Sequence, residues 1–260
     1  MVDGRWLVSQ RWDDLLFAHW PVESDRVRRL LPAGVEPDVR DGAAWLAIVA
    51  FVMVGTRFPE APRWAAMRPI PELNVRTYVR VDDVPGVWFL SLDASSPFFA
   101  TVGRHLYGLR YHVARMTTAT EDGRMHYLSA RQGAAFAATY EPAGPPARAA
   151  RESLEHFLCE RYRLFAERNG HLVTATVIHE PWPLQAAEAR IELNRMAPPG
   201  IALDGAPLVH FARSVDALIS APTAVRRRGP RSLPPCESVS SARGWSARPS
   251  APSWSSSATR

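Results

Sequence analysis

The chain has 260 residues, and 47% of them are hydrophobic, which is enough to form the core of one large globular domain or two small ones. The net charge of +5 arises at the C-terminal end, because residues 223–260 hold seven of the 31 basic side chains and one of the 26 acidic ones, and residues 1–222 carry −1. This near-neutral body argues against a domain that binds a membrane surface or nucleic acid.

The N-terminal segment and the apolar runs predict a cytoplasmic protein. Residues 1–14 lack the charged start and the apolar stretch of a signal peptide. The longest apolar run, residues 43–55, is too short to cross a bilayer. The two cysteines, Cys159 and Cys236, have no C-x-x-C spacing, which fits a reducing compartment. We therefore expect no membrane partner.

All basic residues are arginine, because the sequence contains no lysine. A guanidinium stays protonated and cannot act as an amine nucleophile, so no side chain can form an imine with a substrate. The eight histidines are scattered, without His-x-His or His-Glu-x-x-His spacing. We therefore expect neither a metal site nor a cofactor.

The first predicted elements are a short helix and a buried strand. Residues 21–34 have apolar residues at helical spacing and end at Pro32 and Gly34, which predicts a short helix. Residues 44–54 are almost entirely apolar and rich in β-branched and aromatic side chains. This composition predicts a strand that is buried on both faces.

Residues 72–81 alternate along their whole length, which predicts a strand with two different faces. The more apolar face carries Leu73, Val75, Thr77, Val79 and Val81. The more polar face carries Glu72, Asn74, Arg76, Tyr78 and Arg80. If the polar face lines a barrel interior, it presents an acid, an amide and a guanidinium to a ligand; if it faces water, these are ordinary surface side chains.

The rest of the chain adds mainly strands. Hairpin turns are predicted at residues 82–86 and 121–123, and an amphipathic helix at residues 151–165. Further strands are expected at residues 87–94, 172–180, 186–194 and 207–219. This content predicts a mainly β (α+β) fold, an antiparallel barrel or sandwich with a few peripheral helices.

The composition changes after Pro222. Residues 223–260 are rich in Arg, Ser and Pro and contain too little apolar material to pack. We therefore expect one domain at residues 1–222 and a disordered tail at residues 223–260. A basic tail can contact nucleic acid, or it can be a non-functional extension, and the abrupt end of the domain pattern favours the second interpretation.

A series of co-linear stretches between residues 10 and 220 resembles one known family. The stretches are "LLFAHWPV", "LLPAGVEPDVRDGAAWLAIVAFVM", "PELNVRTYV", "GVWFLSLDA", "LYGLRY", "FLCERYRLF", "HEPWPLQ" and "PLVHFARSVD". Together they resemble the YqjF-like family of bacterial proteins (domain of unknown function 2071). Because that family is considered related to acetoacetate decarboxylase, the resemblance implies a cone-shaped antiparallel β-barrel around an internal pocket.

Residues 103–112, "GRHLYGLRYH", resemble the Gly-Arg-x-x-x-Gly-x-Pro-Lys-Lys pattern of the decarboxylase. Gly103, Arg104 and Gly108 match, while Tyr111 and His112 stand where the two lysines would be. The first of those lysines forms a Schiff base with the substrate, and tyrosine cannot do so. The resemblance therefore implies the pocket without the imine mechanism.

The candidate site residues come from the polar strand face and from this motif. Glu72 resembles the catalytic glutamate of the decarboxylase. Tyr111 is either a proton donor or ligand anchor, whose pKa we expect Arg104 and Arg110 to lower, or a packed core tyrosine. The expected ligand-binding residues are Asn74, Arg76, Arg104, His112 and Trp182.

Three of these assignments have an alternative. Arg104 either binds a substrate carboxylate or pairs locally. His112 could serve as a base, although alternation places it on the opposite strand face from Tyr111. Trp182, in the irregular segment "HEPWPLQ", either forms a lid over the barrel mouth or plugs a barrel end.

Three functions follow from these features. The first is non-catalytic binding of a small anionic oxo or hydroxy acid. The second is a lysine-independent enzyme that uses Glu72 and Tyr111 as an acid/base pair for enolisation, dehydration or hydrolysis, with both side chains within about 3 Å of one ligand atom. The third is nucleic-acid binding through the tail. We expect a small-molecule ligand, and self-association into a homo-oligomer stays open.

Overall fold

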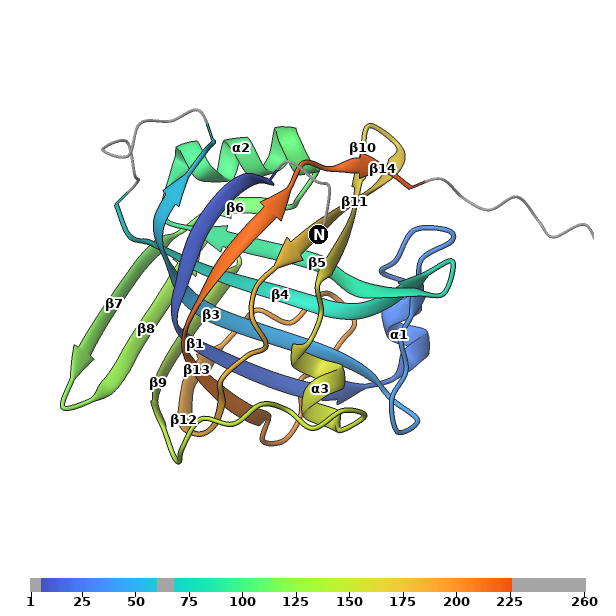
Figure 1. The fold of residues 1–260 in the computed structure, drawn as a ribbon. Coiled ribbons are helices and arrows are strands. Elements are labelled where there is room, and N and C mark those ends of the chain that lie inside the picture. The colour runs from blue at the N-terminus through green and yellow to red at the C-terminus, as the bar shows by residue number, and fades with distance from the viewer. Residues whose placement is uncertain (1–5, 60–67, 226–260) are drawn as a thin grey trace, which may run out of the picture. The chain divides into compact units, whose positions relative to one another are not determined.

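A computed structural model describes residues 6–59 and 68–225, so the predicted tail from residue 226 onward lies outside the described residues. Within the described part, fourteen strands form one sheet (Figure 1). Seven of them close into a ring in the order β11 (His171–Ile178), β10 (Arg163–Arg168), β5 (Val84–Ala94), β4 (Ile70–Val81), β3 (Ala44–Arg57), β1 (Trp6–Val22) and β13 (Leu208–Ser220). Pairing of Val177 with Ile219 and of Ile178 with Leu218 closes the ring between β11 and β13.

The ring confirms the predicted mainly β, barrel-like fold, with a mixed rather than purely antiparallel sheet. All neighbouring pairs in the ring are antiparallel except β10 with β5. Short strands extend it: β2 (Glu36–Pro37) pairs with β4, β6 (Tyr111–Val113) pairs in parallel with β5, and β14 (Thr223–Ala224) pairs with β11. The expected domain end at Pro222 is therefore early, because the two residues that follow it join the sheet.

A second layer continues from β13. It consists of β12 (Leu184–Asn194), β9 (Ala134–Pro142), β8 (Arg124–Arg131) and β7 (Arg115–Glu121), which pair antiparallel in this order. The three helices of the described residues are α1 (Ser24–Arg28), α2 (Pro97–Tyr107) and α3 (Leu154–Cys159). Figure 1 shows α2 at one end of the ring and α3 at the opposite end.

The sheet separates two apolar cores. The interior core takes residues from all seven ring strands, and Phe99 of α2 and Leu158 of α3 close it at its two ends. The outer core lies between the outside of β1, β3, β4 and β5 and the side chains of α1, β8 and β9. Both faces of β3 are buried for this reason, as its apolar sequence predicts.

The helix predicted at residues 151–165 is wrong in its second half. Helix α3 ends at Cys159, and Arg163–Arg168 forms strand β10. Leu164 and Phe165 point to opposite cores from successive positions, as strand residues do, and the left-handed Asn169–Gly170 turn leads directly into β11. Tertiary pairing with β5 and β11 therefore overrides the helical periodicity.

Among the described residues, no helix has both the length and the apolar character that a membrane crossing requires.

Gly108 offers a test of the connection between α2 and β6. It has a φ of 73°, and a Cβ at this position would lie 2.4 Å from the carbonyl oxygen of Glu167 in β10. Gly123, in the turn between β7 and β8, has a φ of 82° and no atom within 4 Å of its would-be Cβ. We expect Gly123→Ala to cost about 1 kcal/mol of unfolding free energy and Gly108→Ala about 3 kcal/mol, because only the second adds a backbone clash.

Chemical denaturation of the two variants measures this difference. Equal losses for Gly108→Ala and Gly123→Ala would contradict the close packing of the α2 end on β10.

Candidate active site in the ring interior

The polar face of β4 is turned into the ring. Leu73, Val75 and Val79 belong to the outer core, whereas Tyr78 belongs to the interior core. Alternation therefore directs Glu72, which is 4% exposed, toward the inside of the ring.

Glu72 is held by a hydrogen bond from the start of β6. The Tyr111 hydroxyl donates to Glu72 Oε2 over 2.6 Å, and the tyrosine side chain is itself buried at 7% exposure. Tyr111 pairs with Leu92 of β5, whose neighbour on β4 is Asn74. The parallel β6 strand thus brings a residue 39 positions later in the chain next to Glu72.

The glycine motif explains how Tyr111 reaches this position. Helix α2 begins at Pro97, and the Ser96 side chain caps it by accepting a hydrogen bond from the Phe99 amide. A Cβ on Gly103 would lie 2.4 Å from two ring carbons of Tyr111, so the tyrosine ring packs directly on the helix backbone. Phe99 meets the same ring edge-to-face at 5.6 Å.

Burial sets the protonation of this pair. Desolvation raises the pKa of Glu72 to about 7, against the opposing effects of the hydrogen bonds from Tyr111 and Asn74. Burial also raises the pKa of Tyr111 well above its usual value, and the Glu72 charge raises it further. The expectation that arginines lower the pKa of Tyr111 is therefore wrong, because the hydroxyl faces a carboxyl group in an apolar interior.

Glu72 and Tyr111 face a cavity of about 90 Å³ beneath α2. Its walls are mainly apolar, and Glu72 is the only charged side chain among the described residues that line it. The other polar groups are Gln10, Trp12 and Tyr107. The Tyr107 hydroxyl donates to the Ser220 carbonyl over 3.0 Å, whereas the buried Trp12 Nε1 has no partner among the described residues.

Sequence reasoning missed these three polar residues. Gln10 and Trp12 lie on β1, and Val8 precedes them on the same face of the strand. Their spacing of two along the strand is the available sequence signal. Tyr107 is the last residue of α2, a helix whose sequence signal is the Ser-Pro start at residues 96–97.

None of the five predicted ligand-binding residues is among the described residues that line the cavity, and two of them lie at the surface. Arg104 is exposed, and its guanidinium donates to the backbone carbonyl of Tyr111 over 3.1 Å and to the Thr101 hydroxyl over 3.0 Å. This is the local structural role that the sequence left open. His112 lies on the opposite face of β6 and is exposed. The partial desolvation of its ring, and next the charge of Arg131, lower its pKa.

Arg76 lies in the ring interior but not in the wall of the cavity. Its guanidinium carbon is 5.7 Å from the Phe17 ring centre and 5.8 Å from that of Tyr78. Its Nε and Nη2 atoms are buried without a hydrogen-bond partner in the described part of the chain. Asn74, between Arg76 and Glu72 on this face, is also buried, and its Oδ1 atom lacks a partner there.

A second polar pair lies deeper in the interior. His19 Nε2 and the Tyr78 hydroxyl are 2.9 Å apart, and His19 is fully buried. Burial lowers the pKa of His19 well below its usual value, and the charge of Arg76 adds to this effect. His19 is therefore neutral at physiological pH.

Trp182 fills the interior rather than covering a mouth. Its indole stacks on Trp12 at 6.0 Å and meets Phe17 edge-on at 5.1 Å. Its Nε1 donates to the Cys159 carbonyl over 3.0 Å. Trp12 thus lines the cavity and also packs against Trp182.

The described residues contain no group of three His, Cys, Asp or Glu side chains that could hold a metal ion.

Comparisons with known proteins give matches of two kinds, one to a family and one to solved structures of similar fold. A family model for DUF2071, described as an uncharacterised conserved protein, matches residues 9–216. The uncharacterised protein YqjF of Bacillus subtilis (strain 168) is 38% identical over 221 residues, which cover 83% of this chain and 91% of YqjF. Both findings confirm the resemblance seen in the sequence.

Solved structures with a similar fold are acetoacetate decarboxylase-like. An acetoacetate decarboxylase-like enzyme from Sphingomonas wittichii RW1 has a TM-score of 0.62 at 18% identity and covers 87% of this chain and 95% of its own. Acetoacetate decarboxylase from Legionella pneumophila has a TM-score of 0.61 at 13% identity, with coverage of 85% and 87%. The enduracididine biosynthesis enzyme MppR, complexed with pyruvate, has a TM-score of 0.63 at 12% identity, with coverage of 86% and 91%. At these identities the likeness concerns the fold alone.

The raised pKa of Glu72 predicts an unusual pH dependence of stability. A carboxyl whose pKa is higher in the folded state than in the unfolded state binds more protons when folded, so stability falls as pH rises from about 4.5 to about 7. Glu72→Gln removes this loss. We expect the gain in unfolding free energy of the variant over the wild type to grow by about 3 kcal/mol between pH 4 and pH 8.

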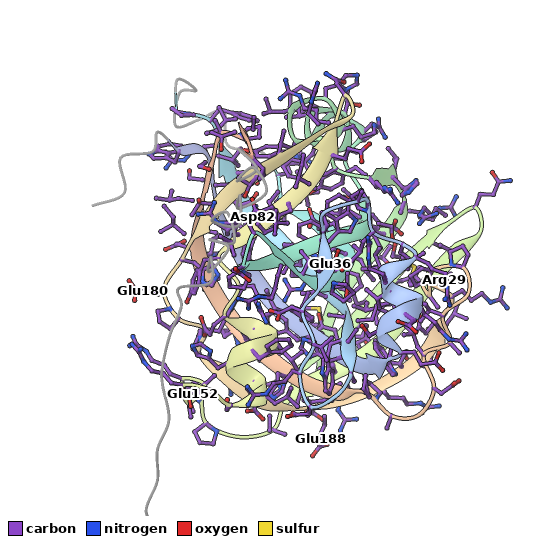
Figure 2. The ribbon with its side chains drawn as sticks, turned by 90° about the vertical axis from the view of Figure 1, so that its right-hand side faces the viewer. Arg29, Glu36, Asp82, Glu152, Glu180 and Glu188 are labelled. Carbon is purple, nitrogen blue, oxygen red and sulfur yellow. The ribbon has the colours of Figure 1, made fainter. Side chains whose placement is uncertain are left out.

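Urea denaturation at a series of pH values measures this change. Glu188→Gln is the matched control, because Glu188 is an exposed carboxylate on β12 (Figure 2). A difference between Glu72→Gln and the wild type that stays constant with pH would show that the pKa of Glu72 is the same in the folded and unfolded states.

Proposed function

This chain belongs to the DUF2071 family, and from the geometry of its ring interior we propose that it is a lysine-independent acid/base enzyme. Glu72 exchanges a proton with a small carbonyl compound in the cavity. Tyr111 holds the carboxylate until the proton is transferred, and its single hydroxyl hydrogen then bonds to the reacting oxygen. The observation that carries the proposal is the buried Glu72 carboxyl, hydrogen-bonded to Tyr111 over 2.6 Å and facing an otherwise apolar cavity.

The pKa of Glu72 suits proton transfer at neutral pH. A general base is most effective when its pKa is near the working pH, and burial brings the pKa of Glu72 to about 7. A buried carboxyl with a strongly shifted pKa in a cavity is a typical sign of a functional site. Structural carboxylates of this protein, such as Asp38 with Arg161 at 2.7 Å, are instead paired with a cation.

The proposed step is enolisation. Glu72 accepts a proton from the carbon next to the carbonyl, so the C–H bond breaks and an O–H bond forms on the carboxyl group. The electron pair moves to the carbonyl oxygen. Because the protonated Glu72 carboxyl no longer needs the Tyr111 hydrogen bond, the hydroxyl turns its single hydrogen to the enolate oxygen. Tyr111 stays protonated in this role, in keeping with its raised pKa.

The cavity favours a small substrate, because its volume is only about 90 Å³. Among the described residues that line it, Glu72 alone is charged, so the cavity favours the carbonyl end of a ligand over an anionic group. The buried Trp12 Nε1 is a further donor for a carbonyl oxygen.

The second candidate is non-catalytic binding of a small anionic oxo acid. Arg76 favours it, because two of its guanidinium nitrogens are buried without a hydrogen-bond partner among the described residues, and an unpaired buried cation is costly. The structure of MppR with pyruvate shows that a protein of this fold binds such an acid. Tail-mediated nucleic-acid binding rests on residues outside the described part of the chain and gains no support here.

Hydrogen–deuterium exchange at the methyl groups of pyruvate and hydroxyacetone tests the proposal. Both probes are small and enolisable, and only pyruvate is anionic. In heavy water, proton NMR should show exchange above the buffer rate for the wild type and for Glu188→Gln. We expect Glu72→Gln to slow the enzymatic exchange at least about 100-fold, because general-base catalysis of this kind contributes about that factor or more.

The pH profile of exchange separates the role of Tyr111 from a purely structural one. The rate should rise with pH and level off above about 7, as Glu72 loses its proton. Tyr111→Phe removes a hydrogen bond that lowers the pKa of Glu72, so the midpoint of its profile should move to higher pH. An unchanged midpoint in Tyr111→Phe would contradict the assigned coupling.

Thermal melts in the presence of each probe distinguish the two candidates. The binding protein would be supported if pyruvate raises the melting temperature of the wild type but not of Arg76→Gln. If the wild type also shows no hydrogen–deuterium exchange, the enzyme proposal is overturned.

A further inference from the structure

A cationic groove lies on the outer face of the ring, away from Glu72. It has a volume of about 310 Å³ and is lined by Leu90 and Ser91 of β5, the β8–β9 turn and residues 195–199. Leu90 is the extra residue of a β-bulge, because Val75 pairs with Ser91 and Arg76 pairs with Phe89. Such bulges redirect side chains, and they are frequent beside functional sites.

Three arginines line this groove, and no acidic residue lines it in the part of the chain that the structure describes. Arg110 follows the end of α2, Arg131 ends β8, and Arg195 follows β12. The side chains of Arg110 and Arg195 are exposed, and neither forms an ion pair with any residue in the described ranges.

Arg131 is fixed from below by a buried carboxylate. Its Nε donates to Asp93 Oδ1 over 2.7 Å, and the Ser129 hydroxyl donates to Asp93 Oδ2 over 3.0 Å. Asp93 is fully buried, whereas the Arg131 side chain is 20% exposed. This contact uses only the Nε edge of the guanidinium. The two terminal nitrogens of Arg131 have no hydrogen-bond partner among the described residues.

The backbone next to the two exposed arginines is also fixed. The Arg110 carbonyl accepts from the Leu92 amide over 3.0 Å, and the Arg195 amide donates to the Ala135 carbonyl over 2.8 Å. Met196, which follows Arg195, is buried in the outer core. The guanidinium groups therefore project from anchored positions at the rim of the groove.

The charge balance of this groove differs from that of the other arginine-rich hollow. Near α3, Arg80 and Arg161 share a hollow with Asp38, which pairs with both of them. In the outer groove, Asp93 balances one of three arginine charges, and two remain. A phosphate monoester carries about −1.5 to −2 at pH 7, which matches this excess.

We propose that the outer groove binds a small organic phosphate. The guanidinium groups of Arg110, Arg131 and Arg195 hold the phosphate, since arginine binds phosphate oxygens in pairs. The apolar wall formed by Leu90, Met196 and the prolines at 198 and 199 contacts the organic part. The site uses neither Glu72 nor Tyr111, so it is independent of the function proposed for the cavity.

Isothermal titration with phenyl phosphate tests the proposal. Inorganic phosphate lacks the apolar part and benzoate lacks the second charge, so both should bind more weakly than phenyl phosphate. Arg110→Ala and Arg195→Ala should each weaken phenyl phosphate binding about tenfold, since one charge-assisted hydrogen bond contributes about 1.4 kcal/mol or more. Arg190→Ala is the matched control, because Arg190 is an exposed residue of β12, and this variant should bind as the wild type does.

Three results would overturn the proposal. The first is equal affinity for phenyl phosphate and benzoate, and the second is wild-type affinity in the Arg110→Ala, Arg195→Ala double variant. The third is a dimer in sedimentation experiments that dissociates in Arg195→Ala, with no phenyl phosphate binding, which would assign the groove to contact with a second copy of the chain.

Discussion

The arrangement of the site depends on the burial of one carboxyl group inside an apolar ring. Glu72 can remain there only with a hydrogen-bond partner, and Tyr111 supplies it over 2.6 Å. The tyrosine ring needs a helix without a side chain at Gly103 and a left-handed residue at Gly108 to bring it back toward β5. The capped helix, the short parallel strand and the glycine motif therefore serve the same requirement, which is a hydroxyl beside Glu72.

The second layer of the sheet follows from the way β4 distributes its side chains. Because its polar face points into the ring, its apolar face points outward and must be covered. Strands β8 and β9 and helix α1 provide this cover, and the Tyr127 hydroxyl donates to the backbone carbonyl of Glu72 over 2.6 Å. The outer layer thus fixes the backbone of the residue whose side chain Tyr111 fixes from the interior. The bulge at Leu90 and the outer groove lie on this same covered side.

The sequence predicts those features of the fold that depend on local periodicity. It does not predict features of the site that tertiary contacts determine. The alternation of β4 and the apolar run of β3 identify both strands, and the relation to the decarboxylase fold follows from co-linear stretches. The same reasoning predicts Arg104 among the ligand-binding residues. Its guanidinium instead lies at the surface, where it donates to the backbone carbonyl of Tyr111. The sequence also gave the wrong direction for the pKa of Tyr111, because the arginines near it in sequence are exposed while the carboxyl near it in space is buried. The sequence around Tyr111 carries no signal for the burial of its hydroxyl or for its hydrogen bond to Glu72, which lies 39 residues away in the chain.

The replacement of lysine by tyrosine changes the electrostatics of the interior as well as its nucleophile. In the decarboxylase pattern, two lysines stand where Tyr111 and His112 stand here, and an ammonium group near a carboxylate favours its ionised form. In this chain His112 faces outward and Tyr111 is neutral, and Arg76 is not among the charges that shift Glu72. Burial therefore dominates, and the pKa of Glu72 rises to about 7 instead of falling. The loss of the amine thus leaves a carboxyl group that can both accept and return a proton at neutral pH, which is the property that acid/base chemistry on a small carbonyl compound requires.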